Sequence, residues 1–248
     1  MSQTTERAMV VVAHPDDPEF IAGGTVAKWI SKGTQVVYVI CTNGDKGSSD
    51  HKMTSERLAA IRKDEQLAAA RLLGVRETVF LGYEDGMLQP TLKLRMDITR
   101  AIRKYRPQKV ICQDPETRYY EQRFLNHPDH RAAGEATLDA IYPSARDRLT
   151  FPQLLAEGLE PFNVEDIYVG SSAHADHWED IDDTIDLKIA ALKQHRSQLD
   201  GSQVETFIRE WAKATADGHG MAYAEAFKYI DLREIGRRSN RDESDARQ

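Results

Sequence analysis

Imidazole and carboxylate side chains are concentrated in two short segments of the chain. Residues 14–19 read HPDDPE and follow a hydrophobic run, and residues 127–130 read HPDH. Neutral imidazole nitrogens and carboxylate oxygens are the ligands that zinc prefers among side chains of these types. The two segments therefore predict a catalytic metal site assembled from distant parts of the chain.

The spacing suggests how three ligands could reach one ion. A catalytic zinc takes three protein ligands and keeps an open position for water. His14 and Asp17 lie three residues apart, so one loop could present both, and His130 could complete the set. Spacing alone does not decide which histidine binds the metal, nor does it name the reaction.

The remaining polar residues of these segments suit proton transfer. Asp16 would stay free beside the metal and could take a proton from metal-bound water, whose pKa the metal lowers. His127 could stabilise an oxyanion or protonate a departing amine, and Asp129 could orient one of the histidines. Taken singly, each segment also has a structural interpretation, because an aspartate-rich loop can cap a helix and two histidines can lie on a helix surface.

The hydrophobic pattern predicts the elements that position these segments. Continuous apolar, β-branched runs are typical of strands buried on both faces. Such strands alternate with helices, which predicts a Rossmann-like α/β fold of three layers (α/β/α) with a mostly parallel sheet. Strands are expected at residues 9–13, 36–40, 79–81, 109–112 and 167–169, and helices at residues 25–31, 54–73, 92–105, 131–141, 185–198 and 204–213.

Polar clusters follow four of these strands at their carboxyl ends. Residues 14–17 come after the first strand, residues 43–45 after the second, Asp85 after the third, and Asp114 with the downstream histidines after the fourth. Ligands of open α/β sheets bind beyond the carboxyl ends of the strands. Their placement at one edge favours the metal site over the separate structural interpretations.

Composition limits the other functions of the chain. It has 248 residues, a formal net charge of −7 and two cysteines, Cys41 and Cys112, which are expected to be buried free thiols. The absence of a basic face argues against nucleic acid, and no apolar run approaches the roughly 20 residues that span a bilayer. We expect a cytoplasmic protein with one domain over residues 1–236 and a charged, disordered tail over residues 237–248.

These motifs resemble those of the LmbE-like, or PIG-L-like, family of zinc-dependent N-acetylglucosaminyl deacetylases. The resemblance rests on AHPDDxE at residues 13–19, GGT at residues 23–25 and HPDH at residues 127–130. Further similar segments are TNGDKG (42–47), FLGYEDG (80–86), and Lys188 with HRSQ (195–198). It implies a metal-dependent hydrolase, with zinc or another divalent metal, that removes the N-acetyl group of a small-molecule amino sugar or conjugate. Relatives are often homo-oligomers, which suggests the same here.

The resemblance also implies a role for each matching residue. His14, Asp17 and His130 match the zinc ligands, and Asp16 matches the general base. His127 matches the histidine that assists the oxyanion or the leaving amine, with Asp129 as its charge partner. Arg62 and Asp85 resemble residues that hold sugar hydroxyls, although a surface arginine and a turn aspartate are their structural alternatives.

Two positions depart from the family pattern. Some relatives carry a tyrosine where this chain has Leu125, so Tyr119, Tyr120 or Arg123 could replace it, or the metal and His127 could suffice. Many relatives have glycine at the position of Ile21, which bears on packing. The role of His195 stays open between the site and a subunit contact.

Three other functions compete with deacetylation. A phosphoesterase would show further carboxylate ligands for a second metal and a denser basic pocket. A nucleotide-binding module would show a glycine-rich phosphate loop, which this sequence lacks. A hydrolase of another amide, or an inactive sugar-binding relative, shares the motifs, but the latter would be expected to lack Asp16 or a ligand.

Overall fold

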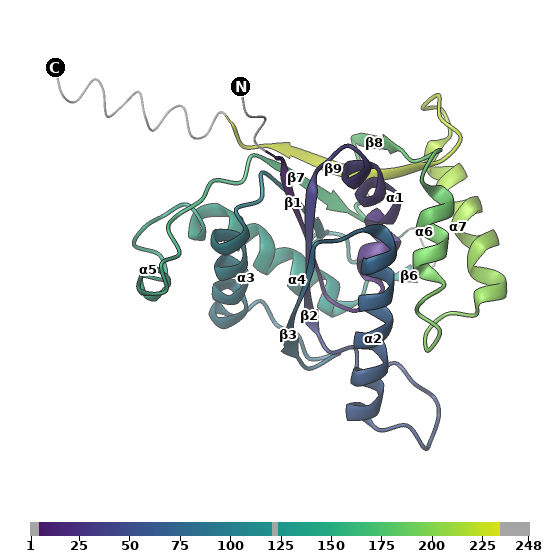
Figure 1. The fold of residues 1–248 in the computed structure, drawn as a ribbon, viewed down its shortest axis with the longest axis horizontal. Helices are drawn as coiled ribbons and strands as arrows, with labels where there is room; N and C mark the ends of the chain where they lie inside the picture. Colours follow the sequence, from purple (N-terminus) through teal and green to yellow (C-terminus); the bar gives the residue numbers. More distant parts are fainter. Residues whose placement is uncertain (1–4, 121–123, 234–248) are drawn as a thin grey trace.

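A seven-stranded sheet forms the centre of the computed structural model, which describes residues 5–120 and 124–233 (Figure 1). Its strands are β1 (Arg7–Val12), β2 (Gln35–Thr42), β3 (Glu77–Tyr83), β4 (Lys109–Gln113), β7 (Asp166–Gly170), β8 (His177–Asp180) and β9 (Ala224–Asp231). The order is β3-β2-β1-β4-β7-β9-β8. Neighbouring strands from β3 to β7 are parallel, whereas β9 is antiparallel to both β7 and β8.

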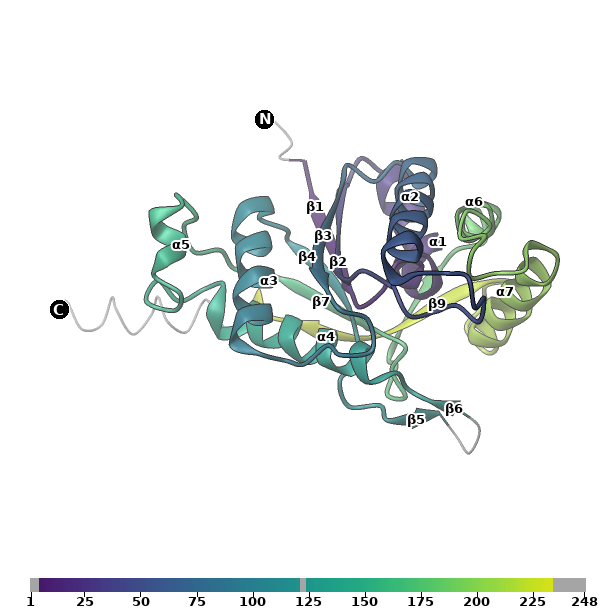
Figure 2. The same cartoon turned by 90° about the horizontal axis from the view of Figure 1, so that it is seen from below.

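Helices cover both faces of this sheet (Figures 1 and 2). One face carries α3 (Leu92–Tyr105) and α4 (Pro128–Asp139), and the other carries α1 (Asp17–Ser31), α2 (Ser55–Leu73), α6 (Ile185–Leu192) and α7 (Gly201–Ala216). A π-helical turn, η1 (Ala140–Ser144), and a short helix, α5 (Gln153–Ala156), follow α4. The predicted three-layer α/β/α architecture with a mostly parallel sheet is confirmed.

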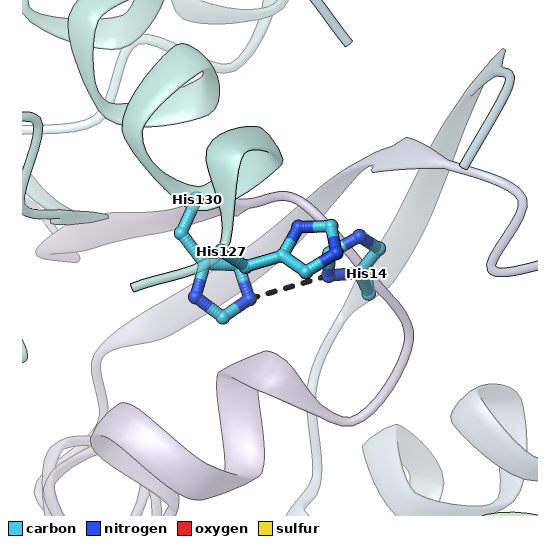
Figure 3. A group of neighbouring side chains, drawn as sticks. All are labelled: His14, His127 and His130. Carbon is cyan, nitrogen blue, oxygen red and sulfur yellow. Dashed lines mark hydrogen bonds between the residues drawn. The ribbon is translucent and has the colours of Figure 1, made fainter. Parts of the chain in front are cut away.

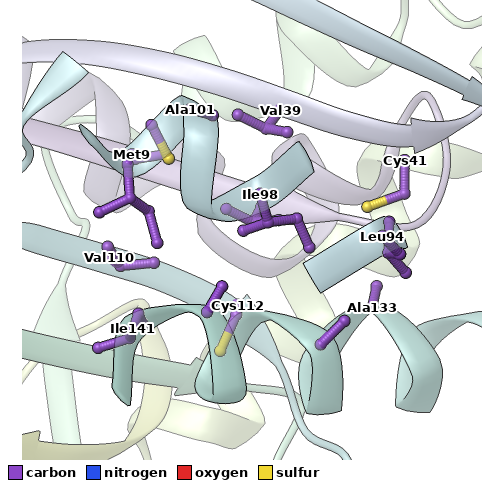
Figure 4. Packing of buried hydrophobic residues seen from close by; sticks show 14 of the residues in the cluster. Met9, Val39, Cys41, Leu94, Ile98, Ala101, Val110, Cys112, Ala133 and Ile141 are labelled. Carbon is purple, nitrogen blue, oxygen red and sulfur yellow. The ribbon is translucent and has the colours of Figure 1, made fainter. Parts of the chain in front are cut away.

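The side chains of β1 alternate between the two layers of helices. Met9 and Val11 pack with α3 and α4 in the cluster of Figure 4, whereas Val10 and Val12 pack with α1 and α2. All four side chains are buried. This is why the strand reads as a continuous apolar run rather than as an alternating one. Cys41 and Cys112 are buried free thiols in the same layer as Met9, as predicted.

Helix α1 begins at Asp17, eight residues before the predicted start at residue 25. Pro18 lies in its first turn, where proline is tolerated because that N–H has no partner within the helix. Gly24 allows α1 to approach the segment before α6, since a Cβ atom there would lie 2.7 Å from Cγ2 of Ile181. Ile21 is buried against Gly170, where a Cβ atom would lie 3.3 Å from the Cβ of Ile21, so the glycine leaves room for this larger side chain.

Helix α4 lies directly against the end of β4. A Cβ atom on Gly134 would lie 2.2 Å from the carbonyl oxygen of Gln113, so only glycine fits there. The Gln113 side chain in turn accepts a hydrogen bond from the backbone N–H of Ala13 at 2.9 Å. These contacts bring the first turn of α4 beside the carboxyl end of β1.

The C-terminal part differs more from expectation. The strand at residues 167–169 is confirmed within β7, but β8 and β9 were not predicted. The helix expected at residues 185–198 ends at Leu192 and continues as turns, whereas α7 extends beyond the expected residues 204–213.

Further expectations concern the loop after β4, the tail and membrane spans. The loop contains a small hairpin of β5 (Tyr119–Tyr120) and β6 (Phe124–Leu125). The predicted tail at residues 237–248 lies outside the described residues, and a single domain stays a prediction. Among the described helices, none has the length and apolarity that a bilayer crossing requires.

Candidate active site

The structure brings the two motif segments together at the carboxyl ends of the parallel strands. His14 follows β1. His127 is the N-cap residue of α4, and His130 lies in the first turn of that helix. Asp85 follows β3, and its backbone N–H donates to the Asp45 carboxylate beyond β2 at 3.2 Å. Residues separated by more than 100 positions in the sequence therefore share one site.

His14, Asp17 and His130 form a compact triangle of potential ligand atoms. Nδ1 of His14 lies 3.3 Å from Nε2 of His130, drawn as the dashed line in Figure 3. The Asp17 carboxylate lies 3.3 Å from Nδ1 of His14 through Oδ2 and 3.2 Å from Nε2 of His130 through Oδ1. Ligand atoms bound to a tetrahedral zinc at 2.0–2.1 Å would stand roughly 3.3 Å apart. The two nitrogens stand at this spacing, and each has a different oxygen of the Asp17 carboxylate at a similar distance.

Hydrogen bonds on the far sides of the rings favour the same interpretation. Nε2 of His14 faces the carboxylates of Asp85 at 3.0 Å and Asp129 at 3.2 Å, so this nitrogen carries a proton. Nδ1 of His130 faces the side-chain oxygen of Asn126 at 3.2 Å. A cation bound between Nδ1 of His14 and Nε2 of His130 would take the place of the proton they share and use a lone pair of each ring.

The charge around His14 favours a cation as well. The carboxylates of Asp129, Asp17 and Asp85 raise the pKa of His14 to about 12, although its burial opposes the rise. Buried carboxylates that converge on one imidazole create a strongly negative environment. A divalent metal would neutralise it.

Asp16 stands beside the triangle in an uncommon backbone conformation. Its φ of 90° and ψ of −31° lie in a region that residues with a Cβ rarely adopt. Its side chain makes no capping hydrogen bond to α1 and instead accepts from Arg62 at 3.1 Å. Burial raises the pKa of Asp16 to about 6 against the opposing Arg62 charge, with a further rise from Asp17. The structural alternative of a helix cap does not apply to this side chain.

His127 adds a third imidazole to the cluster, within 4.8 Å of the nitrogens of His14 and His130. Its Nδ1 accepts a hydrogen bond from the backbone N–H of Asp129 at 3.2 Å and so caps α4. The proton of the neutral ring is therefore on Nε2. Burial and the charges of His14 and His130 lower the pKa of His127.

Asp129 is the most fully enclosed carboxylate of the site. Its Oδ2 accepts from the N–H of Gly86 at 2.7 Å and contacts His14, and its Oδ1 accepts from the N–H of Leu88 at 3.2 Å. The resemblance paired Asp129 with His127, but here its carboxylate contacts His14 and only its backbone contacts His127.

Arg62 and Asp85 both lie at the site, and both are largely enclosed by protein. Arg62 donates to the carbonyl oxygens of Pro15 at 2.7 Å and Gly44 at 3.0 Å, in addition to Asp16. Asp85 accepts from the N–H of Lys46 at 3.1 Å and contacts His14. Their exposed side-chain fractions are only 6% and 8%. The predicted contacts with sugar hydroxyls stay predictions.

Several predicted positions take no visible part in the cluster. The hydroxyl of Tyr120 donates to the carbonyl oxygen of Ser171, and Leu125 and Tyr119 are exposed. Arg123 lies outside the described residues. The Asp114 carboxylate stabilises a local turn with Thr117 rather than reaching the triangle.

The sequence motifs gave no separate role to three polar residues near the triangle. Asn126 orients His130, while Gln66 and Glu19 lie behind Asp16. Asn126 precedes the HPDH motif and Glu19 ends the other motif, so their positions carried a signal. Gln66 lies one helical turn after Arg62, which places both on the same face of α2.

The chain belongs to the GlcNAc-PI de-N-acetylase (PIG-L) family, whose model matches residues 9–141. This confirms the resemblance seen in the motifs. It is 29% identical to the diacetylchitobiose deacetylase of Thermococcus kodakarensis, over 91% of this chain and 83% of the relative. It is 28% identical to the 1D-myo-inositol 2-acetamido-2-deoxy-alpha-D-glucopyranoside deacetylase of Rhodococcus erythropolis, over 80% of this chain and 83% of that one.

A solved structure shows the same architecture. The N,N'-diacetylchitobiose deacetylase of Pyrococcus horikoshii matches with a TM-score of 0.85 and 31% identity, over 92% of this chain and 85% of that chain. These relatives all bear the names of deacetylases of acetylated amino sugars.

Proposed function

We propose that this protein is a zinc-dependent deacetylase that removes the N-acetyl group of an N-acetylglucosamine-type sugar or conjugate. The observation that carries the proposal is the triangle of His14, Asp17 and His130, in which the two ring nitrogens lie 3.3 Å apart and each has an oxygen of Asp17 within 3.3 Å. These residues would hold the metal, which when bound lowers the pKa of its water and polarises the acetyl carbonyl. The deacetylase relatives support the substrate class.

Asp16 is the proposed general base. Its carboxylate is held by Arg62, and with a pKa of about 6 it is mostly ionised at neutral pH. Asp16 takes a proton from the attacking water as the new C–O bond forms at the acetyl carbon. The same proton then passes from Asp16 to the sugar nitrogen as the C–N bond breaks, which releases acetate and the free amine.

His127 is the proposed hydrogen-bond donor to the oxyanion. Its lowered pKa favours the neutral ring, and the hydrogen bond from Asp129 to Nδ1 leaves the proton on Nε2. A neutral donor of this kind stabilises developing negative charge without itself being an acid strong enough to give up its proton. Of the two roles considered for His127, the geometry favours the oxyanion over protonation of the amine.

The test is acetate release from a panel of substrates, with and without a chelator and after zinc is restored. The panel contains N,N'-diacetylchitobiose, N-acetylglucosamine and its inositol conjugate, together with an N-acetyl amino acid and a phosphate monoester. We expect acetate from at least one acetylated sugar, loss of the activity with chelator and recovery with zinc. Recovery with manganese or cobalt but not zinc would contradict the identity of the metal.

The alternative functions give different results in the same panel. Acetate from the amino acid alone would indicate another amide hydrolase, and phosphate release would indicate a phosphoesterase. Binding of the sugars without any hydrolysis, by protein that contains metal, would indicate an inactive sugar-binding relative. Any of these results would overturn the proposed function.

We further propose a single domain over residues 1–236 that forms a homo-oligomer in the cytoplasm, with no nucleic acid or membrane partner. The net charge of −7 supports the absence of a nucleic-acid partner. Among the described helices, none could span a membrane. Light scattering after gel filtration measures the oligomeric state directly, and a monomer at all concentrations would contradict that part.

A further inference from the structure

A buried chain of hydrogen bonds begins at the backbone of Asp16 and does not include the residues of the triangle. The side-chain oxygen of Gln66 accepts from the backbone N–H of Asp16 at 2.8 Å. Its side-chain nitrogen donates to both oxygens of Glu19, at 3.0 and 3.1 Å. Glu19 in turn contacts Nε2 of His195 at 3.2 Å, and Gln66, Glu19 and His195 are all fully buried.

Each member of this chain fixes the next. The Glu19 carboxylate accepts hydrogen bonds only, so it determines which end of the Gln66 amide is the nitrogen. The oxygen of that amide is therefore aimed at Asp16, whose backbone conformation is strained. A strained conformation persists only where the surrounding contacts enforce it.

His195 belongs to a part of the chain far from the motifs. It lies in the turns after α6, 176 residues beyond Glu19 and outside residues 9–141. The same turns are held to the site by other bonds. The Ser197 hydroxyl donates to Glu65 at 2.7 Å, and Gln198 donates to the carbonyl oxygen of Gly47 at 3.1 Å.

His195 has a buried group that these contacts leave unexplained. Its Nδ1 has no hydrogen-bond partner among the described residues, although the side chain is fully buried. An unpaired buried nitrogen costs free energy, and a purely structural position would be better filled by an apolar side chain. The contact with Glu19 is what the imidazole adds.

We propose that His195 is a positioning residue for Asp16, acting through Glu19 and Gln66. The proposal rests on the proposed role of Asp16 as the base. The C-terminal turns thereby complete the site from behind, since they hold the backbone of Asp16 so that its carboxylate stays beside the triangle. Misplacement of a reacting group by about 1 Å can lower a rate by roughly 100-fold.

The first test compares His195→Leu with His195→Gln. Leucine removes the donor to Glu19, whereas the amide nitrogen of glutamine can restore it. We expect His195→Leu to lower kcat by at least about tenfold, with KM and bound zinc nearly unchanged, and His195→Gln to recover most of the activity. Equal activity of His195→Leu and the unchanged protein would overturn the proposal, as would a loss of zinc that accounts for the lower rate.

Lys188→Met is the matched control for a general loss of stability. Lys188 is equally buried on α6, where it contacts Glu225 and the carbonyl oxygen of Phe20 but not Gln66 or Asp16. We expect this variant to keep its kcat at temperatures where it is folded. An equal fall of kcat in Lys188→Met and His195→Leu would assign the effect to packing and overturn the positioning role.

A second measurement does not depend on activity. Hydrogen exchange of the Asp16 amide, followed by NMR, reports its bond to Gln66 directly. We expect faster exchange in His195→Leu and an unchanged rate in Lys188→Met. Unchanged exchange in His195→Leu would overturn the positioning role even in an active enzyme. If His195→Leu speeds exchange but the unchanged protein deacetylates nothing, the positioning role of His195 is supported and the proposed function is wrong.

Discussion

One half of the sheet, β3-β2-β1-β4, and the other half, β7-β9-β8, contribute to the site in different ways. The parallel half carries His14 and Asp17 after β1, and the histidines of α4 follow it in the chain. In the other half, α6 and the turns after it lie between β8 and β9 in the chain. His195 in these turns contacts Glu19 rather than the triangle. The reacting groups thus come from the parallel half, whereas the other part of the chain adds His195 to the residues that hold them in place.

The difference has a physical origin. Parallel strands direct their carboxyl ends to one edge, where loop side chains from several strands converge on a ligand. The elements packed around that edge are free to supply buried contacts, which constrain the loops without touching the ligand. Changes in the two regions should therefore affect metal binding, catalysis and stability to different degrees.

Asp17→Asn should have the largest effect, because it removes the anionic corner of the triangle. We expect loss of bound zinc and of acetate release together. Metal analysis after dialysis, beside the activity assay, checks this. Asp114→Asn is the matched control, since Asp114 lies at the same sheet edge but bonds within its own turn. Full zinc in Asp17→Asn would place the third ligand elsewhere, with His127 as the next choice.

Asp16→Asn should separate catalysis from metal binding within the parallel half. General base catalysis contributes about 10²- to 10⁴-fold, so we expect a fall in kcat of about 10³-fold while zinc is retained. Metal content and kcat, measured on the same preparation, show whether Asp16 acts as the base or as a ligand. If zinc disappears with the activity, Asp16 is a ligand and not the base.

Arg62→Met should shift the pH dependence of the reaction. Asp16 must be ionised to act as base, so kcat/KM is expected to fall as the pH drops below about 6. The Arg62 charge lowers this pKa, so its removal should raise the acidic limb by about one pH unit. The profile of kcat/KM against pH measures the shift. An acidic limb that moves to lower pH would contradict this electrostatic role.

Lys188→Met should have the smallest effect on catalysis but a clear effect on stability. Among the described residues, it leaves the buried Glu225 carboxylate with the N–H groups of Gly24 and Thr25 as its hydrogen-bond partners. Removal of one partner of a buried ion pair costs about 3 kcal/mol, which urea unfolding would measure as a lower free energy of unfolding. A lower kcat with an unchanged free energy of unfolding would contradict the expectation that Lys188 affects stability and not catalysis.

The parallel half could be predicted well because its signals are local. Continuous apolar runs gave β1, β2 and β4, and the motif spacing brought His14 and His130 to one edge. The predicted start of α1 was wrong because proline and glycine, here Pro18 and Gly24, usually interrupt a helix. Proline is in fact tolerated in the first turn, and the glycine is required by the close approach of the segment containing Ile181.

The other half could not be predicted in the same way. Strand β9 lies in the sheet through its pairing with β7, a contact across more than 50 residues that leaves little local trace. His195 resembled the family segment, yet its contact with Glu19 depends on the packing of α6 against α1. The carboxylate of Asp129 likewise contacts His14, a partner far away in the sequence that the residues next to Asp129 did not indicate.

The close contact at Gly134 limits how this enzyme can be re-engineered. The separation between α4 and β4 is set by backbone atoms, and no choice of side chain can widen or narrow it without moving the helix. Because α4 carries His130 at its start, a drift of this helix would open the site by the same amount. Libraries that aim at new substrates should therefore hold residue 134 constant and vary exposed side chains of the loop before α4, such as Tyr119 and Leu125.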